Sequence, residues 1–451
     1  MPVEVQVLSV ASTEMSPAII VTEESQRYLF NAGEGLQRLC MEHRVRLAKL
    51  HHVCLTELTS STVGGLPGLI LTVSDTGKKG LNVFGPSGTK SFMRSTRHFL
   101  HRPDFAMDIQ DLTPSSAKVV HNESLSLQPV VVDDAYASTT TTSDTSPSHK
   151  RAKLMTTANP TTSVSYIGET PTQRGKFLIQ NALALGVPKG KMILHIMQAY
   201  HHTRRSIVRY QQPNSVVSMT LLVHLGNAAV LGHPHYIQWV KSFGPHVNHP
   251  ECPQWSVFRS SATLQTQLHH LFPSNFAAPH HEVAPVERVT VAFGDATIGL
   301  PLLKYTLTPS AKQGLDRSLV MQPLDLPAIH MDTEQTLATA KVSLTHKEAP
   351  TITANDSNAV DGRVTFLGTG SAIPSKYRNV TSNLIAIGSS FLLLDAGEGC
   401  YGQLFRHVGG DDGKLKHLLE NLHVVWISHN HADHHLGLVR LLSQRNPLVS
   451  W

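Results

Sequence analysis

The sequence predicts an α/β fold in which packed sheets carry helices on their outer faces, and it predicts two copies of this unit. One observation is the order of elements. Three strands, a glycine turn, a helix and a fourth strand begin near the N-terminus and return after residue 363. A second is the turn itself, which reads NAGEG at residues 31–35 and DAGEG at residues 395–399. A repeated element order with a repeated turn indicates a duplicated structural unit.

The first copy shows each expected element in turn. Its first strand alternates apolar and polar side chains, as a strand with one buried face does. The glycines of the turn permit positive φ angles, so the chain can reverse sharply into a helix. The predicted elements are strands at residues 3–8, 18–21, 28–30 and 52–55 and a helix at residues 36–47.

The second copy repeats these elements near the C-terminus. A short polar insertion at residues 409–421 separates its helix from its fourth strand. That fourth strand is an apolar run, which predicts burial. The predicted elements are strands at residues 364–367, 383–387, 391–394 and 422–427 and a helix at residues 401–407.

Metal-capable side chains follow the last of these strands in the pattern H-x-H-x-D-H. Neutral imidazole and carboxylate groups are ligands that suit Zn²⁺. One strand end cannot surround one ion with four such groups, but it can serve two neighbouring ions. We therefore predict that His429 and His431 hold one zinc ion, and that Asp433 and His434 hold the other. The alternative is a polar loop that happens to be rich in histidine, and His435 is either a supporting or an exposed residue.

The first copy lacks this ligand set. When Gly65 is placed over Gly437, three hydroxyl groups and one carboxylate fall where the second copy has metal-capable side chains. These positions are Glu57, Thr59, Ser61 and Thr62. Hydroxyls are poor zinc ligands, so we predict a metal-free copy with a structural or substrate-binding role.

Length and composition set the class of protein. A chain of 451 residues is long enough for two domains with cores of their own. The formal net charge of +5 favours a polyanionic partner. The four cysteines are scattered, which indicates a reducing compartment. No apolar run approaches the ~18 residues that span a bilayer, and the N-terminus has neither signal-peptide nor transit-peptide character.

The boundaries of the two domains are predicted at residues 1–308 and 363–451, joined by a polar linker at residues 309–362. Low complexity at residues 133–175 predicts a disordered insertion in the first domain. Residues 176–215 interleave cations with tyrosines, as a phosphate-binding surface does, although a solvated basic face is the plainer interpretation. Those cations include Lys189, Lys191, Arg204 and Arg205.

A glycine-rich turn opens the second copy. Residues 366–380 read FLGTGSAIPSKYRNV, in which a strand leads into the turn and then to Lys376 and Arg378. Backbone N–H groups and two neighbouring cations can hold a phosphate. The segment is not a P-loop, because no G-K-[ST] follows and no helix opens there. The alternative is a tight turn with two exposed basic residues.

The H-x-H-x-D-H loop resembles the ligand loop of the metallo-β-lactamase superfamily, where the pattern supplies four ligands of a di-zinc site. More narrowly, residues 368–380, 395–399 and 429–434 resemble successive motifs of tRNase Z, the tRNA 3′-processing endonuclease. The metal-free first copy is similar to the long, two-copy form of that family, and residues 184–190 resemble the start of its tRNA-gripping arm. The resemblance implies a metallo-β-lactamase αββα sandwich, duplicated.

The same resemblance implies a function. It is the zinc-dependent endonucleolytic removal of the 3′ trailer from precursor tRNA, by a hydroxide that bridges two zinc ions. Asp433 is then placed to take a proton from the attacking water, and Asp395 to brace the ligand loop. Lys376, Arg378 and Asn379 are expected to contact the substrate near the cleavage point, and the arm cations to contact the tRNA body.

One departure from the family pattern concerns completeness. The family's remaining ligands and its leaving-group acid lie downstream of the ligand loop, and this sequence ends at Trp451. We therefore expect a second copy truncated at its C-terminus, without the full di-zinc site and with weak or no cleavage. A homodimer that completes the ligand set is a further expectation.

Two rival functions remain open at this point. The first is another hydrolase of the superfamily, such as a thioesterase or an RNA 5′-processing nuclease. The second is a non-catalytic fragment that binds tRNA or a partner protein. For location, the basic cluster at residues 150–153 and the reducing type of cysteine use favour the nucleus. The mitochondrion comes second, because long-form tRNase Z often serves both compartments.

Overall fold

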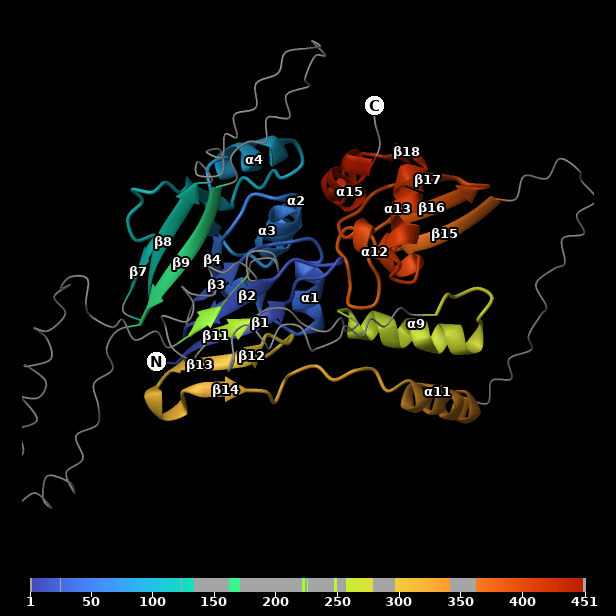
Figure 1. The fold of residues 1–451 in the computed structure, drawn as a ribbon, viewed down its shortest axis with the longest axis horizontal. Coiled ribbons are helices and arrows are strands. Elements are labelled where there is room, and N and C mark those ends of the chain that lie inside the picture. Colours follow the sequence, from blue (N-terminus) through green and yellow to red (C-terminus); the bar gives the residue numbers. More distant parts are fainter. Residues whose placement is uncertain are drawn as a thin grey trace, which may run out of the picture.

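The two copies of the repeat form two mixed sheets that lie side by side, the first mainly in blue with its edge strands β13 and β14 in yellow-orange, and the second in orange and red (Figure 1). The computed structural model describes residues 2–24, 26–122, 124–133, 162–170, 221–223, 225, 247–249, 257–278, 297–340 and 362–448. Within these ranges, no helix is both long and apolar enough to cross a membrane.

The N-terminal copy is built on an eight-stranded sheet in the order β14-β13-β1-β2-β3-β4-β5-β6. The strands from β1 to β3 pair antiparallel, and those from β3 to β6 pair parallel, so β3 and β4 end at the same edge. The strands are β1 (Val3–Ser9), β2 (Ala18–Thr22), β3 (Arg27–Phe30), β4 (Leu50–Cys54), β5 (Gly80–Gly85), β6 (Ala106–Asp111), β13 (Lys304–Thr308) and β14 (Gly314–Asp316).

Helices cover one face of this sheet, and a second sheet covers the other. The second sheet has the order β7-β8-β9, and a small parallel sheet has the order β10-β11-β12. The helices on the first face are α1 (Leu36–Glu42), α2 (Ser60–Val63), α3 (Leu66–Asp75) and α4 (Thr89–Ser95). Two further helices, α9 (Arg259–Leu271) and α11 (Leu326–Ala340), lie beyond the sheet and pack on each other (Figure 1). The remaining strands are β7 (Val120–His121), β8 (Ser126–Asp133), β9 (Thr162–Glu169), β10 (Leu222–Val223), β11 (Val247–His249) and β12 (Thr297–Ile298).

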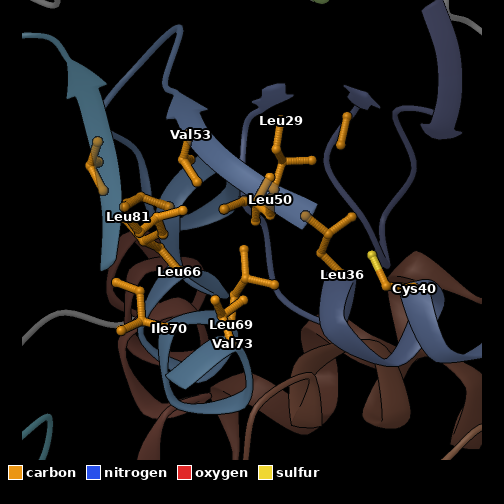
Figure 2. Packing of buried hydrophobic residues seen from close by; sticks show 14 of the residues in the cluster. Leu29, Leu36, Cys40, Leu50, Val53, Leu66, Leu69, Ile70, Val73 and Leu81 are labelled. Atoms are coloured by element: carbon orange, nitrogen blue, oxygen red, sulfur yellow. The ribbon is translucent and has the colours of Figure 1, made fainter. Parts of the chain in front are cut away.

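The N-terminal copy has an apolar core on each side of its sheet. Figure 2 shows the first core, where Leu29 and Val53 of the sheet face Leu66 and Leu69 of α3. The second core lies between the two sheets and includes Tyr28. Two buried faces require apolar side chains on both sides of the central strands, and this explains their nearly continuous apolar runs.

The C-terminal copy has a four-stranded sheet in the order β15-β16-β17-β18, with helices on one face. Leu384 and Leu393 of the sheet pack there against Leu404 and Leu441 of the helices. The elements are β15 (Gly362–Gly368), β16 (Ser382–Ile387), β17 (Ser390–Leu394), α12 (Cys400–His407), α13 (Asp412–Glu420), β18 (Leu422–Trp426), α14 (Ala432–His435) and α15 (Leu438–Arg445).

The other face of this four-stranded sheet is exposed. Phe366 is 71% exposed and Trp426 54%, and Val364 and Val424 on the same two strands are also exposed. The prediction of a buried β18 therefore holds for only one of its faces, because Val425 packs against the helices while its neighbours point to solvent.

Backbone hydrogen bonds show that the two copies share one framework. The N–H of Asn31 donates to the last residue of β4 at 3.0 Å, and the N–H of Asp395 donates to the last residue of β18 at 2.7 Å. Ala32 donates to Thr62 in the first copy, and Ala396 donates to His434 in the second, both at 2.8 Å. This equivalence of Thr62 and His434 is the one that placing Gly65 over Gly437 predicts.

The first helix is shorter than its predicted range of residues 36–47. It ends at Glu42, because Arg44 takes a left-handed conformation with φ 55°. The N–H of Val45 then reaches the carbonyl of Cys40 at 2.8 Å, and that of Arg44 reaches Met41 at 3.3 Å. These two bonds form a Schellman motif, which terminates a helix.

Two segments have more structure than the sequence predicts. Residues 162–169, inside the predicted disordered insertion, form β9 and pair with β8. Buried Val164 and the Tyr166 hydroxyl, which donates to the Leu55 carbonyl at 2.9 Å, hold this strand on the N-terminal sheet. The predicted linker contains β14 and also α11, which packs on α9 where the His270 and His330 rings stack. The rest of the predicted insertion and the predicted arm lie almost wholly outside the described residues.

Candidate metal centre

The predicted ligand loop lies between β18 and α15. The Asp395 N–H ties the end of β18 to the second glycine turn, and the Ala396 N–H ties the turn to the carbonyl of His434. The short helix α14 begins directly after His431 and carries the last two predicted ligands. The glycine turn therefore holds the loop through two backbone hydrogen bonds, and all four predicted ligand side chains lie at the end of β18.

The donor atoms of these side chains lie in two pairs. Nε2 of His429 is 3.0 Å from Nδ1 of His431, and Nε2 of His434 is 3.4 Å from Oδ2 of Asp433. Tetrahedral zinc with bonds of about 2.0–2.1 Å places its ligand atoms about 3.3 Å apart. Each pair therefore has the spacing of one edge of a zinc coordination shell. In the described part of the chain, no three His, Cys, Asp or Glu side chains form one ligand group.

Asp395 braces this loop from the glycine turn. Its Oδ1 accepts the Ser428 N–H at 2.7 Å, and its Oδ2 lies 2.8 Å from Nδ1 of His434. Burial alone raises the pKa of Asp395, but the bonds from Ser428 and His434 outweigh it and hold that pKa below its ordinary value. An Nδ1–H of His434 that donates to this carboxylate leaves Nε2 as the free ligand atom.

Asp433 also touches the glycine-rich turn of the second copy. Its Oδ2 accepts the N–H of Ala372 at 2.8 Å, and Ala372 has a positive φ of 62°. The segment that carries Lys376 and Arg378 is thereby held beside the predicted ligands. We call residues 370–380 the glycine-turn loop.

The predicted substrate residues on the glycine-turn loop differ in exposure. Arg378 is exposed and Lys376 is half-buried, with its Nζ 4.7 Å from the centre of the Tyr377 ring. Asn379 is only 4% exposed, and its Nδ2 donates to the Glu398 carbonyl at 2.8 Å. The expected substrate contact of Asn379 does not fit this burial, because its amide is used inside the fold. Lys189, Lys191, Arg204 and Arg205 lie outside the described residues.

The equivalent loop of the first copy is closed by its own hydroxyls. Oγ1 of Thr59 is 2.9 Å from Oγ of Ser61 and 2.9 Å from Oγ1 of Thr62. Thr59 and Thr62 also form a capping box at the start of α2, and Glu57 is exposed. These groups serve the helix terminus, which supports the prediction of a metal-free copy.

His435 connects the ligand loop to the first copy. Its ring packs edge-to-face on Phe99, with the ring centres 4.7 Å apart. The sequence left its role open, and the structure gives it a packing role between the copies.

Sequence reasoning missed a group of charged residues buried between the copies. Glu34 and Glu398 occupy the same position in the two turns, and both are fully buried. Burial raises the pKa of Glu34 to about 7 and that of Glu398 to about 8. Arg440 lies 3.8 Å from Glu34, and Arg406 pairs with Glu14 across the same boundary. The glutamate that recurs in both turn sequences, NAGEG and DAGEG, is the sequence feature that could have indicated this buried pair.

Comparisons with known proteins agree with this architecture. A model of the tRNase Z endonuclease family matches residues 6–65, and a model of the anti-Pycsar protein Apyc1 matches residues 363–446. The zinc phosphodiesterase ELAC protein 2 of Macaca fascicularis is 30% identical over 98% of this chain and 61% of its own length. The mitochondrial tRNase Z TRZ4 of Arabidopsis thaliana is 28% identical over 97% of this chain and 55% of its own.

A solved structure shows the same fold. The crystal structure of a long-form RNase Z from yeast superposes with a TM-score of 0.71 and 18% identity, over 99% of this chain and 69% of that one. The predicted duplicated fold of the metallo-β-lactamase type is thereby confirmed. The chain spans roughly three fifths of the length of the curated relatives it matches.

Proposed function

We propose that this chain, a relative of the long-form tRNase Z proteins, acts in zinc-dependent endonucleolytic removal of the 3′ trailer from precursor tRNA. The observation that carries the proposal is the pairing of donor atoms at the end of β18, with spacings of 3.0 and 3.4 Å beside a basic loop. The names of the relatives, tRNase Z and zinc phosphodiesterase, support the same reaction and the same metal.

The proposed roles follow from the positions of the side chains. Bound zinc would supply Lewis acidity that lowers the pKa of water and offsets charge on phosphate oxygens. His429 and His431 form one ligand pair, and Asp433 and His434 form the other. Asp433, whose Oδ2 points to both His434 and the glycine-turn loop, is also the group placed to receive the proton of the attacking water.

The proposed partner is precursor tRNA. Arg378 and Lys376 give the glycine-turn loop two cations close to the donor pairs, as a phosphate contact at the cleavage point requires. The arm cations Lys189, Lys191, Arg204 and Arg205 are proposed to contact the tRNA body. For location we propose the nucleus or the mitochondrion, and two Arabidopsis relatives carry mitochondrial in their names.

The test combines zinc content, RNA binding and cleavage on the purified chain. Asp433→Ala is expected to lower zinc content and to remove any cleavage of a precursor tRNA. Asp104→Ala is the matched control, since Asp104 is an exposed carboxylate in the first copy. Unchanged zinc content in Asp433→Ala would refute the proposed ligand role.

A second candidate is zinc-independent tRNA binding without cleavage. It is favoured by the absence of a three-ligand group among the residues that the structure describes. It predicts an affinity for tRNA that falls steeply with salt and does not change when a chelator removes zinc. The same experiment separates the two candidates, because only the first predicts cleavage that zinc restores.

A further inference from the structure

Arg38 on α1 of the first copy is almost completely buried, with 1% of its surface exposed. Its guanidinium stacks on Phe258, with Cζ 4.1 Å from the ring centre. Its Nε donates to the Ser375 carbonyl at 2.9 Å, and its Nη2 donates to the Lys376 carbonyl at 3.4 Å. A buried guanidinium is costly unless its donors are satisfied, and here the acceptors belong to the glycine-turn loop of the other copy.

The far end of the glycine-turn loop is held by the same helix region. Asn379 donates from Nδ2 to the carbonyl of Glu398 at 2.8 Å. The Glu398 carboxylate in turn accepts the N–H of Gly35 at 2.9 Å and Nε2 of Gln37 at 3.0 Å. Residues 35–38 of the first copy therefore fix the loop directly at Ser375 and Lys376 and indirectly at Asn379.

The loop between these attachments is internally closed and touches the candidate metal centre. Gly370 donates to the Asn379 carbonyl at 2.7 Å, and Ser375 donates to the Arg378 carbonyl at 2.8 Å. The Ala372 N–H bonds to the carboxylate of Asp433. Loss of the hydrogen bonds from Arg38 would therefore loosen the positions of Lys376 and Arg378 on the loop and of the Asp433 carboxylate.

We propose that Arg38 is a positioning residue: it fixes the glycine-turn loop of the other copy so that Lys376 and Arg378 face the phosphates of the RNA. Arg38 of the metal-free copy thus shapes the substrate-binding surface without itself touching substrate. This inference rests on the proposed function for the identity of the ligand, and on the hydrogen bonds alone for the ordering of the loop.

The first experiment measures hydrogen exchange and needs no RNA. Arg38→Met keeps the apolar stem and removes the donors, and Arg38→Lys restores one donor and the charge. Arg102→Met is the control, because Arg102 is a part-exposed arginine that pairs with Asp75 of the first copy. In Arg38→Met we expect amides of the glycine-turn loop to exchange about tenfold faster, as the loss of charged hydrogen bonds predicts.

The same exchange data report folding. Unchanged protection of β1 to β4 shows that Arg38→Met is folded, and Arg38→Lys is expected to fall between Arg38→Met and the parent chain. If Arg38→Met loses the protection of β1 to β4, it is not folded. The exchange rates of the loop amides in Arg38→Lys and in the parent chain then decide whether Arg38 orders the loop. Loop exchange equal to that of the parent in a folded variant overturns the proposal.

The second experiment is a double-mutant cycle on the affinity for a precursor tRNA. Arg378→Ala is expected to weaken binding in the parent chain and to have at least threefold less effect in Arg38→Met. Additive effects overturn the claim that Arg38 acts through the loop. If the parent chain binds no tRNA, the proposed function fails, and the exchange experiment alone decides whether Arg38 orders the loop.

Discussion

The carboxylate of Glu398 in the second copy accepts a hydrogen bond from the backbone N–H of Gly35 in the first copy, at 2.9 Å. Glu34, at the equivalent position of the first turn, lies toward Arg440 and the N–H of Gly399 in the second copy. Each of the two turns thus places its glutamate against the other copy.

Stability should depend on the ionisation of the two turn glutamates. Burial raises the folded-state pKa of Glu34 to about 7, and that of Glu398 to about 8, with the charge of Glu34 adding to the latter. A raised folded-state pKa means that stability is fully present below the unfolded value of about 4.3 and is lost as pH rises through 7–8. Glu34→Gln should therefore lose less thermal stability than the parent chain between pH 5 and 8.5.

The measured quantity is the difference in melting temperature between Glu34→Gln and the parent chain at each pH, obtained by thermal unfolding. His43 and His52, whose pKa values burial lowers to about 4, act in the opposite direction below about pH 6.5 and cancel in that difference. Asp104→Asn is the exposed control. Parallel pH profiles for Glu34→Gln and the parent chain would show that Glu34 does not titrate in this range.

Asp395→Asn should weaken zinc binding about 10–100-fold, because residues that orient ligands contribute this much to metal affinity. The amide can still accept a bond from Ser428, but it no longer holds the His434 imidazole as a carboxylate does. Competition with a chromophoric chelator measures the effect. Asp316→Asn, a carboxylate paired with Lys304 far from the centre, should leave zinc affinity unchanged.

Gly437→Ala should destabilise the chain by about 2 kcal/mol or more, as severe steric conflicts in a packed interior do. A Cβ at Gly437 would lie 2.2 Å from the Gly397 carbonyl oxygen and 2.8 Å from Sγ of Cys400. Gly413→Ala, in the first turn of α13, brings a Cβ to 3.2 Å from the Asp411 side chain and should change stability by less than about 1 kcal/mol. Denaturant unfolding of both variants tests the pair, and equal effects would contradict the packing described here.

The exposed face of the β15–β18 sheet should make the chain self-associate, since a contiguous apolar patch favours contact with other molecules. Replacing Phe366 and Trp426 together by Thr should reduce association in sedimentation velocity at high concentration. Met331→Thr is the control, because Met331 is 61% exposed but lies on α11. This measurement also tests the predicted homodimer, and concentration-independent sedimentation of the parent chain would count against it.

Most of the correct predictions rest on local sequence patterns. The two glycine turns, the strands around them and the equivalence of Thr62 with His434 depend on spacing and local conformation, which a sequence displays directly. The burial of Arg38, by contrast, depends on a partner loop more than 300 residues away, and nothing near Arg38 in the sequence indicates it.

The candidate site shows the same division. The ligand loop follows from motif spacing and the brace Asp395 from the family resemblance, and the structure places Oδ2 of Asp395 2.8 Å from Nδ1 of His434. The burial of Asn379 could not be predicted, because its amide bonds to a turn that only the folded chain brings near. The helix end at Arg44 was also missed, since arginine is not a residue that usually adopts positive φ.

Because the two copies belong to one chain, the boundary between them can hold buried carboxylates at a lower entropic cost. Two separate molecules would have to lose translational and rotational freedom to bring the turns together, and their contacts would have to offset that loss. Within one chain each copy meets the other at a high effective concentration. The contact between Glu398 and Gly35 can then persist at protein dilutions where a two-chain assembly would dissociate, and the chain can keep titratable groups buried between its copies without separating them.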